Sequence, residues 1–259
     1  MNDYQAILEF SKVLALKAGE IMLTNFKQDM DFENKSDNTP VTIADTSINK
    51  LIIEEIKKSY PNHSVLGEEE SDKTDLNSCS SKETLWICDP IDGTFPYSMG
   101  MPISTFMLAF LENGIPKVAV IYDPYRKLMF SAIEGMGTYR NDKKISVNSN
   151  TTFERQKIVV DADNPELYKN IVASKNILLS YLSFGYGAIA VASGQVSVAI
   201  YYYDKPWDGA APSLIVKEAG GKVTDLNGND QKYNNTINGI VCSNEFFHDQ
   251  IIQIIKESR

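Results

Sequence analysis

The hydrophobic pattern of the chain changes period part-way, and this change constrains the fold more than any other feature. Apolar residues recur at three- and four-residue steps over residues 4–26 and 45–59, as they do on amphipathic helices. Short apolar or alternating runs bounded by turn-forming residues then follow, at 85–88, 104–111, 117–122 and 128–133. These runs predict antiparallel strands joined by hairpins.

The second half of the chain predicts a regular alternation of strands and helices. Strands are expected at 157–161, 177–182, 195–201, 222–226 and 239–242. Helices are expected at 164–173, 186–193, 208–219 and from Asn244 onward. The whole pattern is that of a mixed α/β protein whose sheets are covered by helices. We expect two halves, residues 1–150 and 151–259, with the seam near 145–157, that act as one functional unit.

The charge balance excludes several classes of partner. Lys and Arg number 25 against 34 Asp and Glu, which gives a net charge of −9, and 43% of the residues are hydrophobic. Nucleic acids and anionic membranes need a basic face, so neither is expected as a partner. The 3 cysteines are odd in number and widely spaced, which argues against a disulfide framework or a structural zinc site. Because the N-terminus also lacks the pattern of a signal peptide, a cytoplasmic protein is expected.

One acidic motif stands directly after a predicted buried strand. Leu85–Cys88 runs into Asp89-Pro90-Ile91-Asp92-Gly93-Thr94. Two carboxylates three residues apart, stiffened by a proline, can converge on one point, and the Gly-Thr pair that follows can turn backbone N–H groups toward an anion. The alternative is that Asp-Pro and Asp-Gly are only turn formers.

Two further carboxylates strengthen the functional interpretation. Glu68 follows the apolar pair Val65-Leu66, and Asp208 stands at the start of a predicted helix, where it could instead act as an N-cap. Together with Asp89 and Asp92 they form a set of oxygen donors without His or Cys. Mg²⁺ prefers such ligands, and like charges gathered in one place would be unstable without a cation.

These segments resemble a known family. Gly67-Glu68-Glu69, Trp86–Thr94 and Trp207–Ala211, with Thr39–Asp45 and Glu218–Gly221, are similar in order and spacing to the motifs of the inositol monophosphatase superfamily. That superfamily contains Mg²⁺-dependent, lithium-sensitive phosphatases, and the resemblance covers nearly the whole chain. It implies a layered α-β-α-β-α sandwich, a homodimer, and hydrolysis of a small phosphorylated substrate.

The resemblance also implies a ligand set for two to three Mg²⁺ ions. Glu68, Asp89 and the carbonyl of Ile91 would hold the first ion, and Asp89, Asp92 and Asp208 the second. Glu68 would reach a weaker third ion through water, and Asp92 and Asp208 would also lie against the substrate phosphate. On this interpretation Asp92 is a metal ligand rather than a core contact, so Asp92→Asn is expected to lower activity by orders of magnitude and leave the fold intact.

Other residues would act on the phosphate and the attacking water. The resemblance implies that the amides of Gly93 and Thr94 bind phosphate oxygens. Thr94, hydrogen-bonded to Asp45, and Glu68 would orient and deprotonate the water. Lys35 stands where the family has a mobile active-site lysine, although a solvated loop lysine explains it equally well. Direct attack by water is expected because no Cys-x5-Arg loop or Ser/His pair accompanies the motif.

The substrate stays open at this level. Inositol phosphatases usually carry a Glu where this chain has Tyr201, and the segment from Ser183 to Ala188 also departs from their pattern. We expect a polyol phosphate such as inositol 1-phosphate, with histidinol phosphate, a sugar phosphate or 3′-phosphoadenosine 5′-phosphate as alternatives. Four aromatic residues either stack on a nucleobase or belong to the core: Phe95, Tyr97, Tyr186 and Tyr201. A pseudo-enzyme that binds metal and phosphate is the non-enzymatic alternative, against which the retained Asp45/Thr94 pair argues.

Overall fold

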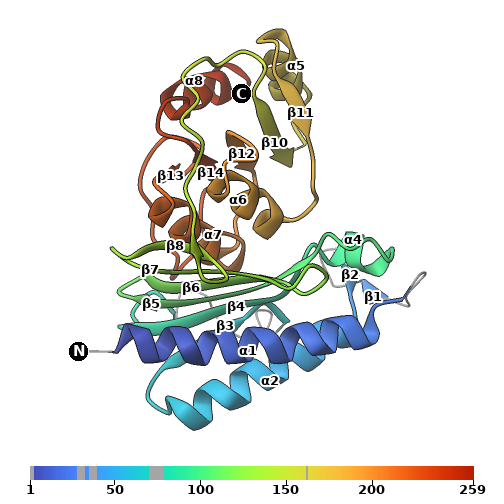
Figure 1. The fold of residues 1–259 in the computed structure, drawn as a ribbon, viewed down its shortest axis with the longest axis vertical. Coiled ribbons are helices and arrows are strands. Elements are labelled where there is room, and N and C mark those ends of the chain that lie inside the picture. The colour runs from blue at the N-terminus through green and yellow to red at the C-terminus, as the bar shows by residue number, and fades with distance from the viewer. Residues whose placement is uncertain (1–2, 28–32, 35–39, 70–78, 162) are drawn as a thin grey trace.

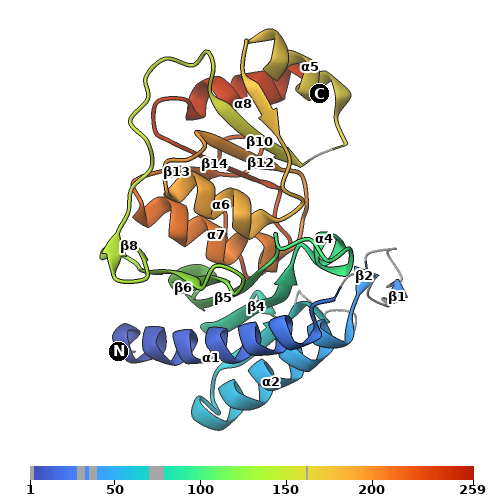
Figure 2. The ribbon, with the colours of Figure 1, turned by 45° about the vertical axis from the view of Figure 1, so that its right-hand side comes forward.

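Helices and sheets alternate in five stacked layers in the computed structural model, which describes residues 3–27, 33–34, 40–69, 79–161 and 163–259. The outer layer contains α1 (Tyr4–Asn25) and α2 (Ile43–Ser59), which lie against one face of the first sheet (Figure 1). Helices α6 (Phe184–Ala192) and α7 (Pro206–Glu218) fill the space between the two sheets. Helices α5 (Pro165–Ala173) and α8 (His248–Glu257) cover the far face of the second sheet (Figure 2). The expected α-β-α-β-α sandwich is confirmed.

The first sheet is antiparallel except at one edge. In sheet order its strands are β3 (Ser64–Gly67), β4 (Thr84–Asp92), β5 (Thr105–Glu112), β6 (Ile115–Asp123), β7 (Leu128–Ile133), β8 (Gly137–Arg140) and β9 (Lys143–Lys144). Only β3 runs parallel to its neighbour, β4. A separate pair of two-residue strands, β1 (Glu33–Asn34) and β2 (Pro40–Val41), precedes α2. The sequence predicted the antiparallel hairpins from β4 onward, but not β3, β8 or β9.

The second sheet mixes parallel and antiparallel pairs. Its order is β11 (Ile177–Leu179), β10 (Lys157–Asp161), β12 (Val198–Tyr201), β14 (Ile240–Ser243) and β13 (Lys222–Thr224). β10 is parallel to both β11 and β12, and the remaining pairs are antiparallel. The first sheet ends at Lys144 and the second begins at Lys157.

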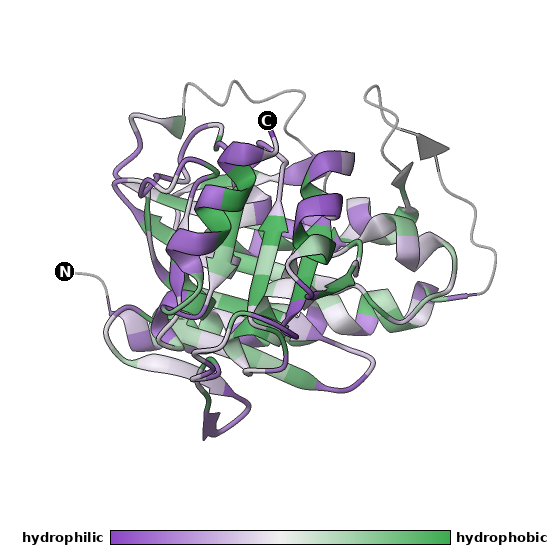
Figure 3. Ribbon diagram, turned by 90° about the horizontal axis from the view of Figure 1, so that it is seen from above, coloured by the Kyte–Doolittle hydropathy of each residue, from purple (hydrophilic) through white to green (hydrophobic). Residues whose placement is uncertain are grey.

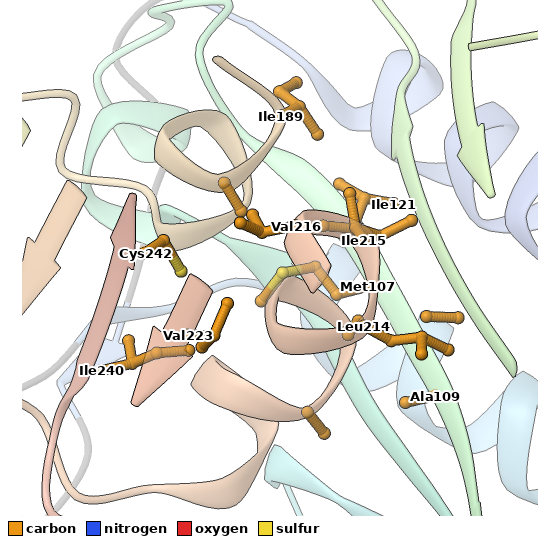
Figure 4. Packing of buried hydrophobic residues seen from close by; sticks show 14 of the residues in the cluster. Met107, Ala109, Ile121, Ile189, Leu214, Ile215, Val216, Val223, Ile240 and Cys242 are labelled. Carbon is orange, nitrogen blue, oxygen red and sulfur yellow. The ribbon is translucent and has the colours of Figure 1, made fainter. Parts of the chain in front are cut away.

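The central core belongs to both sheets. Met107 and Ile121 from the first sheet, and Val223 and Ile240 from the second, pack around Ile215 and its neighbours on α7 (Figure 4). A second cluster lies between the first sheet and α1 and α2, and a third between the second sheet and α5 and α8. Figure 3 shows the hydrophobic residues concentrated along the central strands. The two sheets therefore share the central cluster, and each has a further cluster on its outer face.

Several helix starts lie earlier than the hydrophobic periodicity predicts. α2 begins at Ile43, where Thr42 and Asp45 form a reciprocal capping box. α6 begins at Phe184 with Ser183 as its N-cap, and α7 begins at Pro206 with Lys205 in the N-cap position. Asp208 therefore lies inside the first turn of α7, and the N-cap interpretation of this residue is wrong. No helix among the described residues is long and apolar enough to cross a membrane.

Candidate metal and phosphate site

The acidic motif lies on a bulge at the end of β4. The ladder with β5 pairs Asp89 with Met107 and Asp92 with Thr105, so β4 advances three residues while β5 advances two. Pro90 lies inside this irregular stretch, and proline has no N–H to donate to the ladder. The bulge explains why β4 extends beyond the expected strand 85–88 and brings both carboxylates to one end of the sheet.

Glu68 is brought beside Asp89 by the parallel edge of the first sheet. Gly67, the last residue of β3, pairs with Cys88, so the residues that follow this pair are Glu68, just beyond β3, and Asp89 on β4. A hydrogen bond joins these two carboxyl groups. Helix α2 approaches β3 closely here, because a Cβ at Gly67 would lie only 1.9 Å from the buried side-chain oxygen of Asn49. The glycine before Glu68 is therefore required by packing.

Asp92 is buried and clamped by the first turn of α6. Its Oδ2 accepts hydrogen bonds from Thr105 Oγ1 (3.0 Å), from the Gly185 N–H (2.9 Å) and from Ser183 Oγ, and its Oδ1 accepts the Phe184 N–H (2.8 Å). Burial raises the pKa of Asp92 to about 6, although the four hydrogen bonds oppose that shift. Because each carboxylate oxygen has two lone pairs, only Oδ1 has one free to bind a cation.

Asp89 and Asp208 are buried with far less compensation. Asp89 is 2% exposed and its Oδ1 has no hydrogen-bond partner, while Asp208 is 7% exposed in the first turn of α7. Burial raises the pKa of both groups well above the usual carboxyl range, and the negative charges of Glu68 and Asp92 add to the effect at both positions. An acceptor oxygen buried without a donor costs free energy unless a ligand satisfies it.

Thr94 and Asp45 are joined beside this cluster. Thr94 Oγ1 lies 3.3 Å from Asp45 Oδ1 and 2.9 Å from the carbonyl oxygen of Ile91, and both oxygens accept. Asp45 Oδ2 accepts from the N–H and the hydroxyl of Thr42 at 2.8 and 2.5 Å. Burial raises the pKa of Asp45 to about 7, against these hydrogen bonds. Gly93, in the left-handed conformation (φ 80°), makes the turn into α4 (Thr94–Ser98).

The donor set fits a divalent cation, although its side chains are not yet gathered around one point. The fit rests on the orphaned Oδ1 of Asp89 and on the mutual repulsion of four carboxyl groups that offer only oxygen atoms. Within the described part of the chain, no three acidic, His or Cys side chains already stand close enough together to hold an ion.

The chain also matches known proteins along its length. The sequence model described as the inositol monophosphatase family matches residues 3–259. This chain belongs to the inositol monophosphatase family. It is therefore a member of a family of phosphatases, and the resemblance seen in the sequence motifs is confirmed.

Relatives and solved structures agree with this membership. The fructose-1,6-bisphosphatase/inositol-1-monophosphatase of Thermotoga maritima is 30% identical over 255 residues, which cover 96% of each chain. A solved IMPase structure from Thermotoga maritima has a TM-score of 0.87 at 29% identity and covers 98% of each chain. A structure of an IMPase/NADP phosphatase complexed with Mg²⁺ and phosphate has the same fold, with a TM-score of 0.87 at 24% identity, and covers 97% of this chain and 95% of its own.

Three of the four aromatic residues considered for base stacking are core residues. Tyr97, Tyr186 and Tyr201 are 0%, 5% and 1% exposed, and their hydroxyls donate to Met22 O, Asp123 Oδ2 and Ser183 O. Phe95, at 51% exposure, is the exception. The core interpretation therefore holds for these tyrosines.

The sequence did not predict the hydrogen bonds that hold Asp92, and one residue expected in the site is not among the described residues. A serine two residues before a glycine at a helix start is a capping signal, so Ser183 and Gly185 could have marked where α6 begins. Their contact with Asp92 could not be predicted, because it joins residues 91 to 93 positions apart. Lys35, the expected active-site lysine, lies outside the described residues.

Proposed function

We propose that this protein is a Mg²⁺-dependent phosphomonoesterase that hydrolyses a small polyol phosphate, such as inositol 1-phosphate, by direct attack of water. The observation that carries the proposal is the buried Oδ1 of Asp89, which has no partner and lies within the electrostatic reach of Glu68, Asp92 and Asp208. Burial and neighbouring carboxylates raise the pKa values of Asp89 and Asp208, so this group would be stabilised by cations, and the same cations would attract an anionic ester to an acidic protein.

The proposed ligand set uses the residues expected from the sequence. Glu68, Asp89 and the carbonyl of Ile91 would hold one ion, and Asp89, Asp92 and Asp208 a second, with Glu68 serving a third through water. When bound, Mg²⁺ lowers the pKa of the attacking water and neutralises charge on the phosphoryl and leaving oxygens. Asp92 would contribute through Oδ1, the less occupied of its two oxygens.

The chain's own groups would orient the phosphate and accept a proton. Thr94 Oγ1, already held by Asp45, would position the attacking water, and Glu68 would accept its proton. Backbone N–H groups of Gly93 and Thr94 would donate to phosphate oxygens, because the left-handed turn at Gly93 leads directly into a helix start. In-line positioning and charge neutralisation are what phosphoryl transfer needs most.

The substrate remains a choice among monoesters. The name of the Thermotoga maritima relative includes both fructose-1,6-bisphosphatase and inositol-1-monophosphatase, which supports a polyol or sugar phosphate. The buried positions of Tyr97, Tyr186 and Tyr201 disfavour a nucleotide bound by stacking on them. Histidinol phosphate and 3′-phosphoadenosine 5′-phosphate are therefore comparison substrates in the test below.

The proposal extends to assembly and location. We expect a homodimer, and the exposed apolar side chains of Phe95, Met99 and Met101, on and just after α4, are a candidate contact surface. Light scattering during size-exclusion chromatography would give the mass. We also expect a cytoplasmic location, because the cysteines Cys79, Cys88 and Cys242 are free and buried.

The test is phosphate release from a panel of four esters. Inositol 1-phosphate, histidinol phosphate, fructose 1,6-bisphosphate and 3′-phosphoadenosine 5′-phosphate would each be incubated with Mg²⁺, with chelator, and with Mg²⁺ plus lithium. The proposal predicts release that chelator abolishes and lithium inhibits, fastest with inositol 1-phosphate. A phosphoenzyme trapped by rapid quenching would contradict direct water attack. Mg²⁺ binding without any hydrolysis would instead favour the pseudo-enzyme.

A further inference from the structure

Tyr201 ends β12 with a buried hydroxyl that is fully engaged. The residue is 1% exposed, and its hydroxyl donates to the carbonyl oxygen of Ser183 at 3.0 Å. Its ring packs against Phe184, with 4.4 Å between the ring centroids. Tyr201 therefore contacts the loop that leads into α6, which lies beside β12 (Figure 2), and not the solvent.

Ser183 transmits this contact to Asp92. The carbonyl of Ser183 accepts the Tyr201 hydroxyl, and the side chain of the same residue donates to Asp92 Oδ2. The next two N–H groups, from Phe184 and Gly185, donate to Asp92 as well. The hydrogen bond from Tyr201 thus holds Ser183, the first of three consecutive residues that donate to Asp92.

Gly187 makes room for this arrangement. A Cβ at position 187 would lie 1.6 Å from the Tyr201 hydroxyl oxygen and 2.7 Å from the ring carbon that bears it, so only glycine admits the tyrosine. A glycine inside a helix and a buried hydroxyl are each unfavourable alone. Together they produce one hydrogen bond to the turn that clamps Asp92.

We propose that Tyr201 is a positioning residue for the metal centre, acting through Ser183 on the carboxylate of Asp92. The inference rests on the proposed function, since it assumes that Asp92 binds a cation. By fixing the first turn of α6, Tyr201 keeps Oδ2 saturated with donors and leaves a lone pair of Oδ1 for the ion. Gly187 is also needed for this arrangement, because any side chain at position 187 would displace the Tyr201 hydroxyl.

The first test is Tyr201→Phe, which removes only the hydroxyl. Mg²⁺ binding, measured by titration calorimetry without substrate, should weaken about 3- to 10-fold, as expected for the loss of one buried hydrogen bond. kcat should fall with it, while KM at saturating Mg²⁺ should change less. The control is Tyr202→Phe, because Tyr202 packs into the third cluster on the other side of the same sheet. It should bind Mg²⁺ like the wild type.

Ser183→Ala and Gly187→Ala test the two residues that Tyr201 contacts. Ser183→Ala removes the side-chain donor to Asp92 Oδ2 but keeps the carbonyl that Tyr201 holds, so it should lower the Mg²⁺ affinity, and the double variant should bind Mg²⁺ more weakly than Ser183→Ala alone. Gly187→Ala should reproduce the loss seen in Tyr201→Phe. A Tyr201→Phe protein that loses thermal stability but keeps its Mg²⁺ affinity, or a double variant no weaker than Ser183→Ala, would overturn the inference.

The two proposals fail differently. A wild-type protein that binds no Mg²⁺ would overturn the metal centre and the positioning role together. A wild-type protein that binds Mg²⁺ and hydrolyses the esters, with unchanged Mg²⁺ affinity in Tyr201→Phe, would overturn only the role of Tyr201. Unfolding curves of every variant, recorded in chelator, separate a loss of affinity from a loss of the fold.

Discussion

Asp92 and Asp208 have the same expected role in opposite surroundings. Asp92 accepts four hydrogen bonds from the protein. No hydrogen bond from the described residues is recorded at the carboxylate of Asp208, and its pKa is raised well above the usual range by burial and by neighbouring negative charges. Asp92 is therefore a hydrogen-bonded part of the fold, while Asp208 is a buried group that neighbouring carboxylates repel.

Asparagine substitutions should distinguish these two positions. Asp208→Asn should lower phosphate release by about two orders of magnitude or more, since it removes a proposed metal ligand. In chelator its free energy of unfolding should equal or exceed that of the wild type, because a buried charge is lost. Asp92→Asn should lose activity and also about 1–3 kcal/mol of stability, since its amide NH₂ would face N–H and O–H donors.

Phosphate release and urea unfolding in chelator measure these effects. Equal destabilisation by the two substitutions would show that Asp208 is also a structural group. Because Asp92 is buried and accepts four hydrogen bonds, the expectation from sequence that Asp92→Asn leaves the fold intact is revised. The sequence could predict the acidic residues as a set, because strand ends followed by Asp and Gly are local signals. The sequence could not show that Ser183 and Gly185, which are far along the chain, donate hydrogen bonds to Asp92 Oδ2.

At the scale of elements, a buried histidine fastens α8 to the second sheet. His248 Nε2 lies 2.8 Å from Thr224 Oγ1 on β13, and its Nδ1 lies 2.7 Å from Ser243 Oγ on β14. A neutral imidazole has one donor and one acceptor nitrogen, and each hydroxyl can complement either. Burial, with help from the charge of Lys222, lowers the pKa of His248 to about 4. Protonation therefore opposes the docking of α8.

This histidine should make the fold less stable in mild acid. Between its usual pKa of 6.5 and the folded value of about 4, the unfolded chain binds a proton that the folded chain does not. Its contribution to stability is complete above pH 6.5 and is lost as the pH falls toward 4, on the order of 2 kcal/mol. Urea unfolding of wild type and His248→Gln, compared with Mg²⁺ present, should show a difference that shrinks in this window. A constant difference would rule out the titration.

The elements themselves were predictable where the hydrophobic period is long. The long periodic stretches predicted α1 and α2, and the turn-bounded runs predicted β5 to β7 nearly residue for residue. β3 was missed because a four-residue strand at a parallel edge has too few residues to show a period. β4 was cut short because Pro90 reads as a strand terminator, whereas the bulge accommodates it.

For the whole molecule, the acidic centre should make the metal-free protein sensitive to alkali. The pKa values of Asp45 and Asp92 are raised by burial from 3.8 to about 7 and about 6, and those of Asp89 and Asp208 are also raised by burial. The folded state therefore holds protons that the unfolded state has released. Stability in chelator should fall as the pH rises from about 4 to about 7, opposite in sign to the effect of His248.

Divalent cations should reverse this trend. Mg²⁺ at pH 7 should raise the melting temperature by several degrees relative to chelator, because it binds only the folded state. The Asp208→Asn variant should gain less. Thermal unfolding at pH 5, 6 and 7, with Mg²⁺ and with chelator, tests both statements. A melting temperature that rises with pH in chelator would contradict the account.

The layered architecture was the least derivable property from the residues alone. Alternating helices and strands predict a mixed fold, but the order of the layers was predicted from the motif resemblance. No short sequence pattern indicates that two sheets share one set of helices. The central cluster shows the physical reason: α6 and α7 are apolar on both sides and satisfy both sheets at once. Such helices are recognisable only after the sheets are known.

That shared cluster also joins the two lengths of chain that carry the proposed catalytic groups. Glu68, Asp89 and Asp92 belong to residues 1–150, while Asp208 and the clamp at Ser183 belong to residues 151–259. The pieces 1–150 and 151–259, co-expressed as separate polypeptides, should form a split enzyme. Each piece alone should release no phosphate, and the pair should be active in proportion to their association. The chemistry would then report the meeting of two polypeptides, as a complementation reporter does.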